Sequence, residues 1–190
     1  MRTATITRKT KETDIAAALC LDGGPVHVDT GVGFFDHMLT ALAVHGGLGL
    51  ELACKGDLHV DAHHTVEDCG IVLGQALAGA LGDKLGVARF GHAVIPMDEA
   101  LAEAAADVSG RGFLVLTAQF SQEAAGDFPL CLCEEFWRAV AANAGITLHL
   151  RLYYGANGHH EAEALFKAAA HALRIAAAPK AGVLTTKGSI

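Results

Sequence analysis

The stretch HHTVEDCGIVLGQAL, residues 63–77, decides how the chain is organised, because HHEAEALFKAAAHAL at residues 159–173 repeats it 96 residues later. Both stretches begin with a histidine pair and continue to a glutamate, Glu67 in the first and Glu163 in the second. Apolar residues then recur at spacings of three and four, which is the pattern of a helix with one buried face. The sequence therefore predicts two related amphipathic helices.

The segments in front of these helices repeat as well. A shift of 98 residues sets LTALAVHGGLGLEL, residues 39–52, against WRAVAANAGITLHL, residues 137–150. The same shift aligns His37 with Glu135. Two repeats are too few for a solenoid, but they are enough for two halves to cover one another. We therefore expect one domain built by tandem duplication, with its two repeats at approximately residues 1–92 and 93–190.

Alternating segments between Gly and Pro residues predict strands, and the helical periodicity predicts four helices. The order is strand, strand, helix, strand, helix, and it occurs twice. Helices with one apolar stripe need a sheet to cover it, so the fold class is α/β, in the α+β sense of helices packed on sheets. We expect strands within residues 3–10, 13–22, 48–56, 88–110, 113–120 and 146–155, and helices at residues 33–46, 65–82, 134–145 and 161–178.

The composition is that of an ordered protein with a large core, since 52% of the 190 residues are hydrophobic and 18% are charged. A formal net charge of −7 without a run of Lys or Arg disfavours nucleic acid and anionic membranes as partners. The N-terminus lacks a secretory signal, and no stretch is apolar enough to span a bilayer. We therefore expect a cytoplasmic protein.

The five cysteines are an odd number and contain no CxxC pair, so a disulfide framework is not expected. Cys131 and Cys133 form a CxC, which fits ordinary strand alternation better than a metal site.

The histidine pairs suggest a metal site. On a helix, residues three apart share a face, so His64 can converge with Glu67 and His160 with Glu163. Imidazole and carboxylate together favour manganese, iron or zinc. The adjacent histidine points about 100° around the helix, so it could serve a second centre or one across a subunit interface. A single HHxxE is more typical of a solvated surface, and it is the second copy in register that favours metal binding.

Other residues suggest an anionic substrate. The C-terminal TTKGS, residues 185–189, offers Thr185, Thr186 and Lys187, a composition suited to phosphate but also typical of a polar tail. Three isolated cations near the ends of predicted elements are further candidates, although each alone is more typical of a surface: Arg89, Arg111 and Lys167.

Several ordered motifs together resemble the imidazoleglycerol-phosphate dehydratase family of histidine biosynthesis. They are GVGFFDHMLTALAVHGG, GDLHVDAHHTVEDCGIVLGQAL, RFGHAVIPMDEAL, DVSGRGFLV, NAGITLHLRLYYG, HHEAEALFKAAAHAL and TTKG. The resemblance implies two half-domains of the ribosomal protein S5 domain 2-like kind, each with a four-stranded sheet and two helices. It also implies a homo-oligomer of 24 subunits, with active sites formed between subunits and two Mn²⁺ in each site, iron or zinc being alternatives.

The resemblance also implies roles for individual residues. Glu12 of KETD would act on the substrate as acid or base, and Glu67 and Glu163 would also be catalytic. Glu135 stands in EEFW, where many members have the histidine of EHFF. The phosphate would be held by Arg89, Arg111, Lys187 and the hydroxyls of Thr185 and Thr186, with Lys167 nearby. The metal ligands would be His37, His63, His64, Glu67, Glu135, His159, His160 and Glu163.

Two positions depart from the family in a way that bears on these ligands. Ala62 and Gly158 stand where the family often has an aspartate that could orient an imidazole. We therefore expect the metal to be removed more readily by a chelator.

The implied reaction is the loss of water from imidazole glycerol phosphate, which yields imidazole acetol phosphate. Two other classes of function are considered. A metal carrier would need the HHxxE repeats but not Arg111, Lys187 or Glu12. A small-molecule kinase of the same half-domain fold would need a glycine- and serine-rich phosphate loop, which the sequence lacks.

Overall fold

The computed structural model describes residues 1–182, so Thr185, Thr186 and Lys187 lie outside the described residues. The first half comprises β1 (Thr3–Lys9), β2 (Thr13–Cys20), β3 (Val26–Asp29), α1 (Gly33–Gly46), β4 (Gly49–Gly56) and α2 (His63–Leu81). The second half comprises β5 (Phe90–Met97), β6 (Ala100–Asp107), β7 (Phe113–Thr117), β8 (Ala124–Ala125), β9 (Phe128–Pro129), α3 (Leu132–Ala144), β10 (Thr147–Tyr154) and α4 (Gly158–Ala176).

Two sheets in the described residues have the same topology. Their strand orders are β1-β2-β4-β3 and β5-β6-β10-β7. In both sheets the last-named pair, β3 with β4 and β7 with β10, is parallel, and the other pairs are antiparallel. The predicted fold class, a duplicated half-domain with a four-stranded sheet and two helices, is therefore confirmed. The proposed division near residue 92 stays a prediction.

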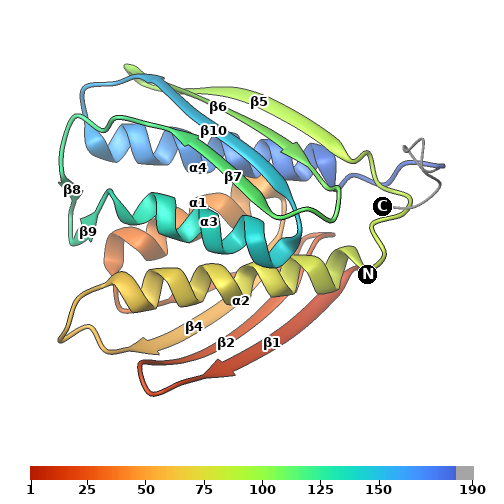
Figure 1. Cartoon of the computed structure of the whole chain (residues 1–190), viewed down its shortest axis with the longest axis horizontal. Coiled ribbons are helices and arrows are strands. Elements are labelled where there is room, and N and C mark those ends of the chain that lie inside the picture. The colour runs from red at the N-terminus through yellow and green to blue at the C-terminus, as the bar shows by residue number, and fades with distance from the viewer. Residues whose placement is uncertain (183–190) are drawn as a thin grey trace.

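The helices lie in a layer between the two sheets (Figure 1). On one side α2 packs on β1 and β2, and on the other α4 packs on β5 and β6. Within the layer, α2 packs against α3 and α1 packs against α4, so each helix pair joins the two halves. The strands alternate buried and exposed residues, as in β2, because one face of each sheet covers the helices.

Aromatic side chains from both halves fill the centre of the helix layer. Phe136 of α3 contacts Phe35 of α1 at 5.3 Å and Phe166 of α4 at 5.5 Å between ring centroids. Trp137 packs on Phe166 at 5.0 Å, and all four rings are buried. A single core therefore spans the duplication.

The element boundaries differ from the predictions in three respects. The strand β3 was missed because it is only four residues long, and half of its residues are exposed. The helices α2, α3 and α4 begin two or three residues earlier than expected, so both histidine pairs lie in the first turn of their helices. Strand alternation at Cys131 and Cys133 was wrong, since Cys131 is the N-cap of α3 and Cys133 lies in its first turn.

All five cysteines are free thiols, as expected from their spacing. Within residues 1–182, no helix combines the length and apolarity needed to cross a membrane.

A close approach in the helix layer, where α2 packs beside α3, depends on glycine. A Cβ atom added at Gly74 would meet the Cβ of Asn143 at 2.7 Å and the carbonyl oxygen of Val140 at 2.8 Å. Gly74→Ala should therefore destabilise the protein by about 1–2 kcal/mol, because overpacking outweighs the gain in helix propensity. The free energy of unfolding in denaturant measures this loss.

Gly79→Ala, in the same helix, is the matched control. Its added Cβ would meet one atom within 4 Å, the Cβ of Ala4 at 3.0 Å. We expect a smaller loss for this variant, and a Gly74→Ala protein at least as stable as Gly79→Ala would contradict the packing argument.

Candidate functional site

Three side chains of kinds that can bind a metal ion come together from the two halves where α1 packs beside α4. His37 Nε2 of α1 lies 3.4 Å from Glu163 Oε2 of α4, and His159 Nε2 lies 3.1 Å from the same oxygen. One donor atom from each of the three residues lies within 4.8 Å of the others. The ring of Phe34 packs edge-on against both histidines. We call these three residues the α1–α4 cluster.

The first turns of α1 and α4 are held in place by side-chain caps. The Asp127 carboxylate accepts hydrogen bonds from the backbone N–H groups of Gly33, at 2.9 Å, and Phe34, at 3.1 Å. Asn157 caps α4 by accepting from the backbone N–H of His159 at 3.0 Å. Because Asp127 belongs to the second half and α1 to the first, its cap fixes His37 relative to Glu163 across the duplication.

The carboxylate of Glu163 is charged although it is largely buried, its side chain being 9% exposed. Burial raises its pKa, but the hydrogen bond and charge of Lys167 and the nearby His37 outweigh burial, so its pKa lies below the ordinary value. Lys167 Nζ lies 2.7 Å from Glu163 Oε1. The cluster therefore presents a carboxylate that is ionised at neutral pH.

The predicted partners within each HHxxE were wrong by one position. The first histidine of each pair faces the glutamate, with His63 Nε2 at 3.6 Å from Glu67 Oε2 and His159 at 3.1 Å from Glu163. Residues four apart are offset by about 40° around a helix, and those three apart by about 60° in the other direction. The second histidine of each pair has other carboxylates within reach, so it turns away from the glutamate.

The second histidines, His64 and His160, form hydrogen bonds with Asp57 and Glu99, which were not among the predicted site residues. His64 Nδ1 lies 3.0 Å from Asp57, and its Nε2 lies 3.9 Å from Glu12, the predicted acid or base. His160 Nδ1 lies 2.7 Å from Glu99. The hydrogen bonds with Asp57 and Glu99 raise the pKa values of the two imidazoles above the ordinary value.

Glu135 lies on α3, the helix that corresponds to α1, but it forms an ion pair of its own. Arg138 Nη1 lies 2.8 Å from Glu135 Oε2, and Arg138 Nη2 lies 2.5 Å from Glu134. The Glu135 side chain is 29% exposed. Its role as a metal ligand stays a prediction.

The predicted phosphate-binding cations fall into two places. Arg89 and Arg111 both approach Asp107, at 2.8 Å and 3.5 Å, and the backbone N–H of Arg89 bonds to Ala176 at the end of α4. Lys167 lies instead beside Glu163. Ala176 lies thirteen positions after Glu163, so the two places are about 20 Å apart along the helix axis.

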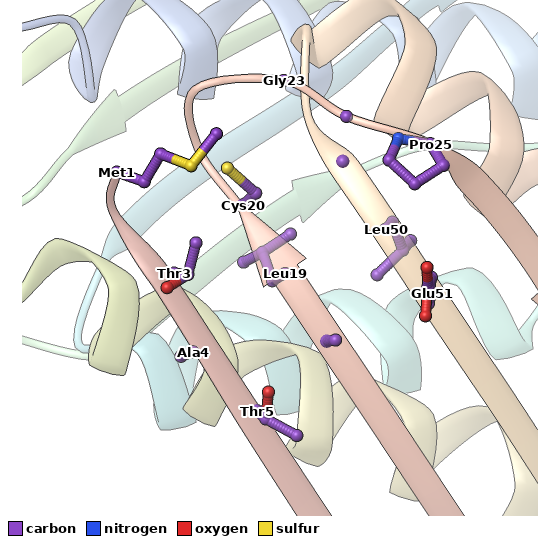
Figure 2. A pocket seen from close by; sticks show the side chains of 13 residues that line it. Met1, Thr3, Ala4, Thr5, Leu19, Cys20, Gly23, Pro25, Leu50 and Glu51 are labelled. Carbon is purple, nitrogen blue, oxygen red and sulfur yellow. The ribbon is translucent and has the colours of Figure 1, made fainter.

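A pocket of about 300 Å³ lies away from these groups, at the ends of β1, β2 and β4. Figure 2 shows Met1, Leu19, Cys20 and Glu51 among the side chains around it. None of the described residues that line it is a histidine or one of the predicted site residues. The α1–α4 cluster, and not this pocket, is therefore the candidate site.

Comparison with known proteins identifies the family of the chain. The sequence pattern of imidazoleglycerol-phosphate dehydratase matches residues 30–173, which include both histidine pairs and His37. The chain belongs to the imidazoleglycerol-phosphate dehydratase family. It is therefore an enzyme, a hydro-lyase of histidine biosynthesis, and both the suggested resemblance and the enzyme class are confirmed.

Individual members of the imidazoleglycerol-phosphate dehydratase family are similar over their whole length. The protein of Acidiphilium cryptum is 58% identical, covering 98% of both chains, and that of Salinibacter ruber is 55% identical, covering 100% of this chain and 96% of its own. The crystal structure of the Staphylococcus aureus enzyme superposes with a TM-score of 0.86 at 43% identity, covering 94% of this chain and 99% of that one. The enzyme from Pyrococcus furiosus gives 0.87 at 36% identity, covering 97% and 100%.

The α1–α4 cluster has donors that suit a divalent ion, and its two separations at Glu163 fit one. Ligand atoms about 2.1 Å from an ion and at right angles to each other are about 3 Å apart. The 3.1 Å and 3.4 Å separations at Glu163 are of this size. Two imidazoles and one ionised carboxylate suit manganese, iron or zinc.

Loss of the Asp127 cap should loosen α1. The backbone hydrogen bonds, that of Phe34 above all, hold the pKa of Asp127 below the ordinary value. Its stabilisation is therefore fully present above the unfolded pKa of about 3.9, and it is lost as the pH falls through the lower folded pKa. Asp127→Ala should lower the free energy of unfolding at pH 7 by about 1 kcal/mol.

Denaturant unfolding of Asp127→Ala and of the parent protein at a series of pH values tests this cap. The difference between them should shrink as the pH falls below the range of carboxyl groups. Asp127→Asn keeps an acceptor and should lose less stability. A difference that does not change with pH would contradict the role of the charge.

Proposed function

We propose that the protein dehydrates imidazole glycerol phosphate to imidazole acetol phosphate in the cytoplasm, using two bound Mn²⁺, with iron or zinc as alternatives. The observation that carries this proposal is the α1–α4 cluster, in which His37 of the first half lies beside His159 and Glu163 of the second HHxxE. Relatives more than 50% identical carry the name of this activity.

The duplication suggests which residues would hold each ion. His37, His159 and Glu163 would contribute to one centre, and their counterparts Glu135, His63 and Glu67 would contribute to the other. His64 and His160 point away from these glutamates, so we propose that each completes a centre with residues of a neighbouring subunit.

The proposed reaction needs help at the carbon that loses a proton. The hydroxyl leaves from the carbon attached to the imidazole ring, and the proton leaves from the next carbon, which no carbonyl acidifies. Bound manganese would act as a Lewis acid at the ring nitrogens, so that the ring can accept electrons. We propose that Glu12, whose side chain is 53% exposed and lies 3.9 Å from His64 Nε2, moves the proton at that carbon.

Lys167 keeps Glu163 ionised, and it also offers a positive charge beside the α1–α4 cluster for the substrate phosphate. Arg89 and Arg111 lie about 20 Å further along α4, which is too far for a small substrate bound at the cluster of the same chain. We therefore propose that a neighbouring subunit supplies these arginines, in a 24-subunit assembly. The rest of the phosphate site would be Lys187 with Thr185 and Thr186.

Removal of the metal should abolish both activity and the large assembly, because ligands from two subunits would no longer be bridged. Dialysis against a chelator, followed by metal analysis, an assay for imidazole acetol phosphate and sizing by light scattering, tests this. Addition of Mn²⁺ should restore both properties. Full activity in protein verified to be free of metal would refute the proposal.

Glu12→Gln should leave the metal content unchanged and lower turnover by a factor of about one hundred or more, because a placed proton donor or acceptor contributes that much. Steady-state rates and metal analysis of the same preparation measure both quantities. The exposed Glu123 provides a control, since Glu123→Gln should leave both unchanged. Near-normal turnover of Glu12→Gln would exclude Glu12 as the acid or base.

A further inference from the structure

The hairpin that carries Glu12 is itself duplicated. In the first half Thr3 of β1 pairs with Cys20 of β2, and in the second half Phe90 of β5 pairs with Asp107 of β6. Both partners are shifted by 87 residues, so the two hairpins correspond residue by residue. The same shift places Glu99 on Glu12, each in the turn of its hairpin.

The two corresponding glutamates contact their histidines differently. Glu99 Oε2 lies 2.7 Å from Nδ1 of His160, which is a hydrogen bond. Glu12 Oε1 lies 3.9 Å from Nε2 of His64, which is beyond hydrogen-bond distance. Glu99 thus lies at Nδ1 of its histidine, whereas Glu12 lies on the Nε2 side of its own.

The difference arises from Asp57, in the segment between β4 and α2. Its two carboxylate oxygens lie 3.0 Å and 3.2 Å from His64 Nδ1, so this nitrogen already has a partner. The β4 to β10 shift of 98 residues puts Gly155 at the position of Asp57 in the second half. Gly155 has no carboxylate to offer. Glu99 therefore makes at His160 Nδ1 the contact that Asp57 makes at His64 Nδ1.

A carboxylate at Nδ1 determines what the other nitrogen can do. It accepts a hydrogen bond from Nδ1–H, so the lone pair of the neutral ring lies on Nε2 and the orientation of the ring is fixed. Glu99 is itself held by the backbone N–H of Ala156 at 3.2 Å, close to the start of α4. Asp98 lies 3.7 Å from His160 Nε2, which is beyond hydrogen-bond distance.

We propose that Asp57 and Glu99 are positioning residues that turn Nε2 of His64 and His160 toward the metal, and that Asp57 thereby leaves Glu12 free for proton transfer. The inference rests on the proposed function in requiring that these histidines bind metal and that Glu12 transfers the proton. It gives the two halves different tasks, because the second half uses for positioning the glutamate that the first half uses for chemistry.

Two identical substitutions at corresponding positions test the proposal. Glu99→Gln and Glu12→Gln each exchange one carboxylate for an amide in the same hairpin turn. The affinity for Mn²⁺, from electron paramagnetic resonance of the free ion during titration, should fall about tenfold or more in Glu99→Gln, and it should not change in Glu12→Gln. Saturating Mn²⁺ should restore turnover in Glu99→Gln but not in Glu12→Gln.

Two further variants test the positioning role at the second histidine and provide a control away from both histidine pairs. Asp57→Asn, in the other half, should also weaken Mn²⁺ binding about tenfold or more. Glu103→Gln changes a similar pair on the outer face of the second sheet, where Glu103 lies 2.8 Å from His92 Nε2, and should leave the affinity unchanged. The mass of the assembly is measured for every variant at saturating Mn²⁺. Affinities are then compared only between variants that assemble to the same size as the parent.

Parent-like affinity in Glu99→Gln and Asp57→Asn would overturn the positioning role, and so would an equal loss in Glu12→Gln or Glu103→Gln. A parent protein that binds no Mn²⁺, iron or zinc would instead refute the proposed function, and the positioning role with it.

Discussion

Each helix has one face on the sheet of its own half, and it can bury the face turned away from that sheet only against a helix of the other half. The remaining architecture follows from this constraint. Each sheet covers one side of its helices, so the other side must find a partner within the same layer. The pairs α1 with α4 and α2 with α3 satisfy this requirement, with Gly70 and Gly74 allowing α2 and α3 to approach closely. Residues that are more than one hundred positions apart thereby come into contact.

The candidate site is a consequence of the same packing. His37 meets His159 and Glu163 because α1 packs beside α4, and Asp127 and Asn157 hold the backbone at the N-termini of the two helices. A buried carboxylate without compensation would be costly, and Lys167 supplies the compensating charge. The counterpart of Lys167 on α2 is Ile71, whereas the extra carboxylate at Glu135 is paired with Arg138. The two related groups of side chains therefore differ in their electrostatics.

The sequence predicted most of the elements because they depend on local periodicity, and α1 was predicted with its observed bounds. It predicted the duplication because motifs with the same side chains recur 96 and 98 residues apart. It predicted the wrong histidine as the partner of each glutamate, because spacing on a helix does not show which carboxylates approach from neighbouring loops. Asp57 and Glu99 were missed for the same reason. The correspondence of Glu99 with Glu12 was detectable only through the strand register, since its shift of 87 differs from the 96 and 98 of the other segments.

Anomalous X-ray diffraction at the manganese absorption edge, from crystals of the active protein grown with Mn²⁺, tests most directly the claim that the duplication builds two related metal centres. The account predicts one anomalous peak about 2.2 Å from donor atoms of His37, His159 and Glu163, and a second bound by His63, Glu67 and Glu135. An active, manganese-containing crystal with no peak at ligand distance from either glutamate of the HHxxE repeats would contradict it.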